Sequence, residues 1–287
     1  MTTLWSGLSL GAVYALVALG YNVVFISSGI FNFAQASLLT LGTFFAYLGV
    51  VTLHLNPVLT ILMATAGCLI VGLIEERVAI RPLSGKLSRA ELVTTVGFAA
   101  LIEGTIALIW GTVPLQVPFF GSTTVLTIFG GRIIPDSLVL IIFVIVLALA
   151  LHVWYKYSLS GLASIAVAED RVAAQLRGIN VGRRSIVAFA MGGAIAGLAG
   201  ILVAPQTYAI SNLGDAIGLT AFIAFALGGT GSLLGATIGG LAVGIIEQEV
   251  ARYVGSLYTN SILYVILLFI LLVMPNGLFG RSTVRAI

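Results

Sequence analysis

The first 74 residues of this 287-residue chain contain no aspartate, glutamate, lysine or arginine. A charge-free run of this length is enough for three membrane crossings of about 20 residues each. Only 8% of the whole sequence is charged, where a soluble domain has roughly 25%. Because so little charge cannot cover the surface of a soluble globule, a cytosolic enzyme, a nucleic-acid-binding protein and a disordered protein are excluded.

Apolar runs bounded by charges, proline and glycine predict an all-α, polytopic integral membrane bundle of eight to nine transmembrane elements, forming a single domain over 1–287. The expected spans are 5–26, 31–53, 57–74, 92–110, 137–154, 185–204, a stretch at 216–246 divided at its glycines, and 260–274. The piece 234–246 is short for a full crossing, which leaves the count between eight and nine. The Pro- and Gly-rich segment 111–136 is expected to be a loop.

Lysine and arginine gather in three segments: four lie in 75–91, five in 156–184 and two after Met274. Cytoplasmic loops of membrane proteins carry an excess of these residues, so the three segments are assigned to the cytoplasm. Three spans precede the first basic segment. The N-terminus is therefore expected outside and the C-terminus in the cytoplasm of a cell whose plasma or inner membrane the chain crosses many times.

Polar side chains inside the apolar runs are candidates for a transport pathway, because such groups are costly in lipid and tend to face a cavity or another helix. They are the amides of Asn22, Asn32 and Gln35 and the carboxylates of Glu103 and Asp215. For Glu103, a pathway role and a plain contact with a neighbouring helix both remain open. Asp215 follows the irregular segment 206–214, which is either a gate or an ordinary extracellular loop.

The polar segment 156–184 is expected to contain a cytoplasmic helix over 162–177 that contacts a protein partner. Its apolar residues fall on one helical face: Ile165, Val172, Leu176 and Ile179. The acidic pair Glu169 and Asp170 lies elsewhere on its surface, and Gly178 follows its last turn as a helix-ending glycine. The alternative is an amphipathic helix lying on the membrane, which the acidic pair disfavours.

Residues for catalysis are missing from this sequence. The two histidines, His54 and His152, have no cysteine, histidine or carboxylate at metal-binding spacing. Neither a G-x-x-x-x-G-K-[ST] phosphate loop nor a G-x-S-x-G nucleophile motif occurs. The chain is therefore not expected to be an enzyme, and no metal or cofactor is expected in it.

A series of short motifs resembles the permease subunits of branched-chain (hydrophobic) amino acid ABC importers, and it is most similar to the first, H-type, of the two permeases. In chain order the motifs are 11–20 (GAVYALVALG), 32–34 (NFA), 76–79 (ERVA) with Arg81 and Pro82, 168–170 (AED), 178–180 (GIN), 196–200 (AGLAG), 228–232 (GGTGS) with Gly235 and Ala236, and 274–277 (MPNG). They run over essentially the whole sequence.

This resemblance implies a channel-forming subunit that moves branched-chain or hydrophobic amino acids, or a related small amide, urea or aromatic carboxylate, into the cell. The implied partners are a sister permease, two cytoplasmic ATPase subunits that bind ATP and magnesium, an extracytoplasmic substrate-binding protein and membrane lipid; nucleic acid is not among them. The segment 156–184 would then be the coupling loop that docks on the ATPases.

One departure from the family pattern concerns the second span. The family commonly has Asn-Phe-Ala-His-Gly-Glu there, whereas this chain has Gln35, Ala36 and Ser37 in the last three positions. Ser37 therefore joins the pathway candidates, and its neutrality is compatible with a more neutral passage or with one that is less hostile to an anion.

A stand-alone secondary transporter or channel is the alternative function. It would use Glu103 inside the bundle for coupling, with Asp215 as the second available acid, but the sequence shows no inverted repeat. An intramembrane enzyme is disfavoured because no catalytic set is present.

Overall fold

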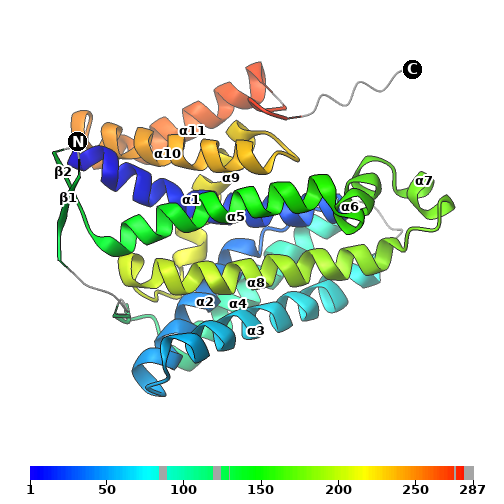
Figure 1. Ribbon diagram of the computed structural model, residues 1–287, viewed down its shortest axis with the longest axis horizontal. Coiled ribbons are helices and arrows are strands. Elements are labelled where there is room, and N and C mark those ends of the chain that lie inside the picture. The colour runs from blue at the N-terminus through cyan, green and yellow to red at the C-terminus, as the bar shows by residue number, and fades with distance from the viewer. Residues whose placement is uncertain (84–88, 119–123, 129, 275, 281–287) are drawn as a thin grey trace.

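The computed structural model describes residues 1–287 except 84–88, 119–123, 129, 275 and 281–287. It is a bundle of helices, α1 (Thr2–Ser28), α2 (Gln35–Tyr47), α3 (Pro57–Glu75), α4 (Arg89–Trp110), α5 (Pro135–Tyr157), α6 (Leu159–Glu169), α7 (Arg171–Leu176), α8 (Val181–Thr207), α9 (Leu213–Gly228), α10 (Leu233–Tyr253) and α11 (Ser256–Val273). Short turns η1 (Leu48–Thr52), η2 (Glu76–Ile80) and η3 (Arg81–Leu83) extend α2 and α3. Figure 1 shows the long helices lying roughly side by side.

Within the described residues, eight helices are long and apolar enough to cross a membrane, which confirms the expected polytopic helical bundle. The division of 216–246 was expected to leave a short second piece, and that expectation is wrong. The second piece, α10, has 21 residues because it continues through Glu247 to Tyr253, whereas the first piece, α9, has only 16.

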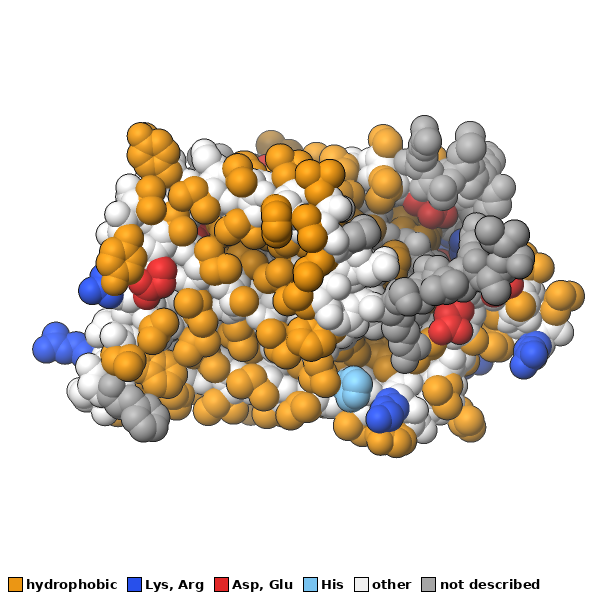
Figure 2. All heavy atoms as spheres, turned by 90° about the horizontal axis from the view of Figure 1, so that it is seen from above, with side chains coloured by type: hydrophobic (Ala, Val, Ile, Leu, Met, Phe, Trp, Pro, Cys, Tyr) orange, Lys and Arg blue, Asp and Glu red, His pale blue; other side chains and the backbone are white. Residues whose placement is uncertain are grey.

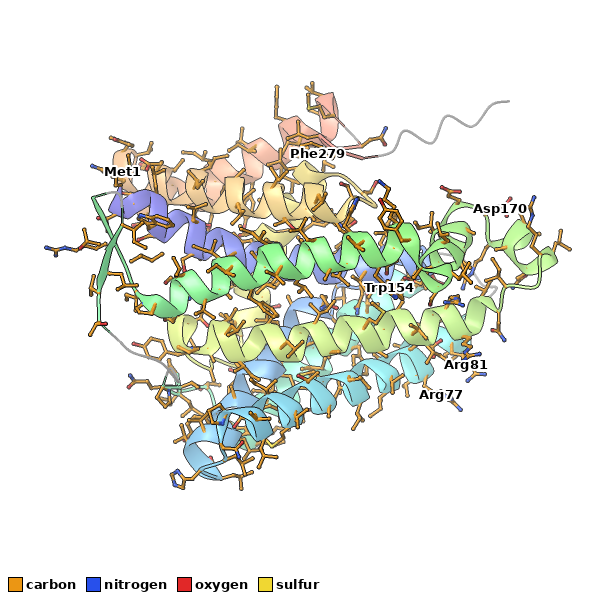
Figure 3. The ribbon with its side chains drawn as sticks, viewed as in Figure 1. Met1, Arg77, Arg81, Trp154, Asp170 and Phe279 are labelled. Atoms are coloured by element: carbon orange, nitrogen blue, oxygen red, sulfur yellow. The ribbon has the colours of Figure 1, made fainter. Side chains whose placement is uncertain are left out.

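The segment 111–136, expected to be a loop, contains a small antiparallel hairpin. Its strands β1 (Leu126–Ile128) and β2 (Gly131–Ile133) pair with Thr127 opposite Arg132. The hairpin lies at the same end of the bundle as Met1, which we call the hairpin end (Figure 1). The opposite end, which carries Arg77, Arg81 and Asp170, we call the α7 end (Figure 3).

Charge and burial are distributed as lipid requires. Hydrophobic side chains cover the middle of the face in Figure 2, while most charged side chains lie toward the two ends. Helix α1 is central, because 89% of its most apolar stretch is buried, against 22% for α3, α4 and α5 and 17% for α11. The outer helices therefore present apolar faces to lipid or to other subunits.

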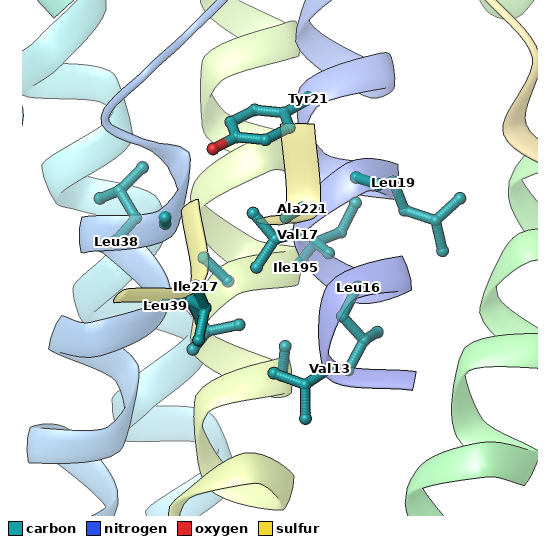
Figure 4. Close-up of a cluster of buried hydrophobic side chains, with 14 of the residues drawn as sticks. Val13, Leu16, Val17, Leu19, Tyr21, Leu38, Leu39, Ile195, Ile217 and Ala221 are labelled. Atoms are coloured by element: carbon teal, nitrogen blue, oxygen red, sulfur yellow. The ribbon is translucent and has the colours of Figure 1, made fainter. Parts of the chain in front are cut away.

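The core forms where α1, α2, α8 and α9 meet. Figure 4 shows Val13 and Val17 of α1 on the side of that helix that faces Leu39 of α2 and Ile217 of α9. Close approach of the helices depends on small residues. A Cβ added to Gly11 would lie 2.7 Å from the carbonyl oxygen of Gly240 on α10. Gly7 and Gly11, four positions apart on α1, both meet the backbone of α10 in this way, so their spacing serves helix packing.

Two of the sequence motifs form one structural unit near the α7 end. The turn between α9 and α10 carries Gly228, and residues 276–280 lie against it. The amide of Leu278 donates a hydrogen bond to the carbonyl of Leu227 at 2.8 Å, and that of Phe279 donates to Gly228 at 3.2 Å. Asn22 completes the unit, since its side-chain oxygen accepts a hydrogen bond from the amide of Gly231 at 2.8 Å.

We expect Gly11→Val to lower the thermal unfolding midpoint of the purified chain in detergent. Its side chain would overlap the backbone of α10, and overpacking of this kind costs about 1–3 kcal/mol. The matched control is Gly97→Val on α4, where an added Cβ meets no atom within 4 Å. Equal midpoints for the two variants would contradict the packing role of Gly11.

Candidate functional site

Two helices, α2 and α9, begin inside the bundle rather than at its ends. After α1 ends at Ser28, Gly29 adopts a left-handed turn with φ 72° and the chain re-enters the bundle to start α2 at Gln35. The side-chain amide of Gln35 donates a hydrogen bond to the carbonyl of Gly192 at 3.0 Å. Because Gly192 lies eleven residues inside α8, the start of α2 is about 16 Å from the beginning of that helix.

The start of α9 is reached through the segment 208–212. Here the backbone of Ala209 pairs with that of Leu115, with hydrogen bonds of 2.9 and 3.0 Å. Ala209 and Ser211 are buried, so this irregular backbone is covered by protein, as a membrane requires. Tyr208 and Asn212 of the same segment are exposed, so both sequence interpretations of 206–214, a gate and an ordinary loop, stay predictions.

Glu103 links the two helix starts. Its carboxylate accepts a hydrogen bond from the hydroxyl of Ser37 at 2.9 Å, which joins α4 to α2. Its carboxylate also lies against the first turn of α9, because a Cβ added to Gly214 would be 2.5 Å from its Oε1, and it is close enough to interact electrostatically with Asp215. This contact joins α4 to α9. Ser37, Glu103 and Asp215 therefore meet inside the bundle, although Ser37 and Asp215 are 178 positions apart in the sequence.

A cavity of about 190 Å³ opens beside this meeting point. Its walls are Tyr21 of α1, Phe33 of the segment before α2, Ser37, Val96 and Ala99 of α4, and the first two turns of α9 from Gly214 to Leu219. The cavity combines one acidic group, Asp215, with apolar and aromatic surface, and Glu103 lies behind the lining residue Ser37. A larger groove of about 280 Å³ on α11 is lined only by apolar, Tyr and Ser side chains, so the smaller cavity is the functional candidate.

Aromatic rings pack next to the cavity. Phe31 is at their centre, with its ring centroid 4.6 Å from that of Tyr21, 4.7 Å from that of Phe33 and 5.2 Å from those of Phe222 and Phe225. These rings hold the segment before α2 against α1 and α9.

Asn32 anchors this same segment. Its side-chain oxygen accepts a hydrogen bond from the amide of Ala34 at 2.9 Å, and its side-chain nitrogen donates to Glu75 at 3.1 Å. Glu75 and Glu76 are buried at 0% and 3% exposure, so the basic segment 75–91, which the sequence assigned to the cytoplasm, begins with two residues that lie inside the protein. Helix α3 continues past them through η2 and η3, and the amide of Asn32 stabilises the carboxyl group of Glu75.

The six pathway candidates thus separate into groups. Ser37, Glu103 and Asp215 converge beside the cavity, whereas Asn32 and Gln35 fix the start of α2. Asn22 lies apart and supports the α9–α10 turn. Sequence reasoning missed Glu75, Tyr21 and Phe33. An acidic pair placed directly after a long apolar run was the available signal for Glu75.

The predicted cytoplasmic helix over 162–177 is divided in the structure, which corrects that expectation. Asp170 ends α6 and caps α7, because its carboxylate accepts hydrogen bonds from the amides of Val172 and Ala173, both at 2.9 Å. Gly178 follows α7 with φ 82°.

The expected apolar face of this segment is also split between the two helices. Ile165 of α6 packs against the main core, and Ile179 packs against a small cluster of Val167, Ala174 and Val181. Val172 and Leu176 remain exposed, at 66% and 84%. The exposed apolar surface of α7 is therefore a pair of side chains one turn apart rather than a four-residue stripe.

Ser37 is neutral itself but has an acidic neighbour. The sequence made it compatible with a more neutral passage or with one that is less hostile to an anion. In the structure, the carboxylate of Glu103 on α4 accepts a hydrogen bond from the Ser37 hydroxyl, so an acidic group lies beside this position although the residue itself is neutral.

The fold and this site define a multi-pass membrane protein of the transporter class. A family model described as "Branched-chain amino acid transport system / permease component" matches residues 3–273. The chain belongs to this family, and the ABC-importer permease function expected from the sequence is confirmed.

Curated relatives cover almost the whole chain. The high-affinity branched-chain amino acid transport system permease protein LivH of Escherichia coli K12 is 32% identical over 297 residues, covering 99% of this chain and 96% of LivH. The permease protein BraD of Pseudomonas aeruginosa is also 32% identical, covering 98% and 96%. Among solved structures, PsaBC from Streptococcus pneumoniae in complex with Fab has a chain with the same fold, at a TM-score of 0.52, 12% identity and coverage of 96% and 93%.

We expect Glu75→Leu to destabilise the segment before α2. Leucine leaves the buried amide of Asn32 without its acceptor, at a cost of about 1–3 kcal/mol. Glu75→Gln is the matched control, because its side-chain oxygen still accepts that hydrogen bond. Thermal unfolding in detergent measures the difference; a Leu variant as stable as the Gln variant would show that Asn32 does not depend on Glu75.

Proposed function

We propose that this chain forms one half of the membrane pathway of an ABC importer for branched-chain or related hydrophobic amino acids. The observation that carries the proposal is the cavity where α2 and α9 begin, because it places polar groups and irregular backbone inside a membrane bundle. The transport activity stated for LivH and BraD supports the choice of amino acids over an amide, urea or aromatic carboxylate.

A sister permease is the proposed partner at the open side of this cavity. Asp215 is exposed in the isolated chain although it lies among membrane-spanning helices. A carboxylate facing lipid at that depth costs several kcal/mol, so a second permease that covers it and encloses a water-filled passage removes this cost. The sister chain is either a second copy or a related permease.

Two cytoplasmic ATPase subunits are the proposed energy source, and ATP and magnesium would bind to them rather than to this chain. An extracytoplasmic binding protein would deliver the substrate at the hairpin end. The exposed Val172 and Leu176 on α7 are the proposed contacts with an ATPase groove. Asp170 would act by holding α7 in place as its N-terminal cap, and Glu169 and Gly178 would flank the contact.

We assign the α7 end to the cytoplasm and the hairpin end to the outside. Arg77, Arg81 and Asp170 lie together at the α7 end, opposite Met1 (Figure 3). The gathering of arginines supports this orientation, because cytoplasmic surfaces of membrane proteins are enriched in lysine and arginine.

Replacing both Val172 and Leu176 by aspartate should abolish co-purification of the ATPase subunits with this chain. The two side chains are exposed, so the chain itself should remain folded, as judged by an unchanged unfolding midpoint. Gln175→Asp, an exposed position on the same helix, is the control and should retain the ATPases. Normal co-purification of the double variant would remove α7 from the docking surface.

ATP-driven uptake is the direct test of the proposed function. Proteoliposomes with the two permeases and the ATPases, supplied with the binding protein, should accumulate leucine only when ATP is present on the ATPase side. Uptake that needs no ATPase and follows an ion gradient would instead establish the stand-alone transporter.

A further inference from the structure

We propose that Glu103 and Asp215 recognise the ammonium group of the solute as it passes the cavity between α2, α4 and α9. The pathway itself would then select for a positively charged head group joined to a compact apolar body, in addition to any selection by the binding protein. This inference rests on the proposed function and assigns the substrate-recognising groups within it.

The first argument is the placement of the carboxyl groups. Asp215 lines the cavity, and the Glu103 carboxylate lies next to that lining, where it is hydrogen-bonded to Ser37 and adjoins Gly214, the neighbour of Asp215. The two acids come from different helices, so the site forms only when α4 and α9 approach each other. A solute that bridges both acids would bind the closed arrangement best.

The second argument is charge. None of the nine residues that line the cavity is a lysine, arginine or histidine. Two neighbouring carboxyl groups in a poorly solvated site repel each other when both are ionised, and they are stabilised by a shared proton or by a cation between them. An ammonium group supplies that cation together with up to three hydrogen-bond donors.

The third argument is the aromatic part of the cavity lining. Tyr21 and Phe33 line the cavity, and both are in contact with the ring of Phe31. Aromatic faces attract cations and also pack against apolar groups. The volume of about 190 Å³ corresponds to about six water molecules, which suits a small organic solute.

A purely structural role explains only part of the arrangement. Glu103 beside the first turn of α9 stabilises that helix start, because helix N-termini favour negative charge. Glu103 alone would be enough to stabilise the start of α9. The nearby carboxylate of Asp215 is not needed for that role, and it repels the carboxylate of Glu103. Solute recognition and helix stabilisation can be separated by exchanging two residues that are in contact. Serine replaces Glu103 on α4 and glutamate replaces Ser37 on α2, whose hydroxyl lies 2.9 Å from the Glu103 carboxylate.

The experiment uses the complete transporter in proteoliposomes, with leucine as the transported probe. Glu103→Gln and Asp215→Asn should each reduce leucine uptake about tenfold or more, since each removes a charge that faces the ammonium group. The double variant Ser37→Glu with Glu103→Ser should transport better than Glu103→Ser alone, because the carboxylate returns to the cavity from the neighbouring helix.

A binding measurement adds a result that a structural role would not produce. In the permease–ATPase complex without binding protein, isothermal titration should detect isoamylamine and should show weaker binding in Asp215→Asn. The anion 4-methylpentanoate, which carries a carboxylate on the same 3-methylbutyl group, should not bind either protein. Asp215 is exposed, so this variant does not remove a buried packing contact.

The control is Glu247→Gln, an acid in α10 that interacts with Tyr14 and does not line the cavity. Its uptake should stay within about twofold of the unaltered transporter. If the unaltered transporter fails to take up leucine, the proposed function is wrong. If it transports leucine but Asp215→Asn does so equally well, or the carboxylate swap brings no recovery, or 4-methylpentanoate binds as well as isoamylamine, the ammonium assignment is overturned.

Discussion

The lack of water in the lipid phase is the constraint on which this structure depends, because every backbone N–H and C=O group there must find a partner within protein. Long helices meet this demand along most of the chain. The irregular segments before α2 and α9 can exist at membrane depth only because Asn32, Gln35 and the backbone pairing of Ala209 satisfy them. These segments are therefore where polar side chains can enter the bundle, and the candidate site lies where they end.

Close packing around α1 gives those segments a rigid support. Small residues let α10 approach α1 on one side, while α8 and α9 close the core on the others. Helix α4 is packed differently, since it packs mainly against α2 and the turn η2, reaches α9 through Glu103, and leaves much of its surface exposed. The helix that carries Glu103 thus borders the buried core on one side only.

Much of the fold followed from the sequence, and the exceptions have physical causes. Spans could be read from apolar runs because length and hydropathy decide which helices cross a membrane. The count within 216–246 depended on where glycines end a helix, and Glu247 was not expected to continue α10 into the bundle. The break at Asp170 was missed because helical periodicity continues across it, although a side chain that caps backbone amides stops the first helix and starts the next.

The sequence by itself determined that the chain is a multi-pass membrane protein, which segments are basic, and which polar residues are costly enough in lipid to need an explanation, because these properties depend on composition and order alone. Tertiary structure alone decided which of those residues meet. Glu103 and Asp215 are 112 positions apart, and nothing in the local pattern shows that Ser37 lies between their helices. Their convergence depends on two helices starting inside the bundle, which is set by packing among distant segments.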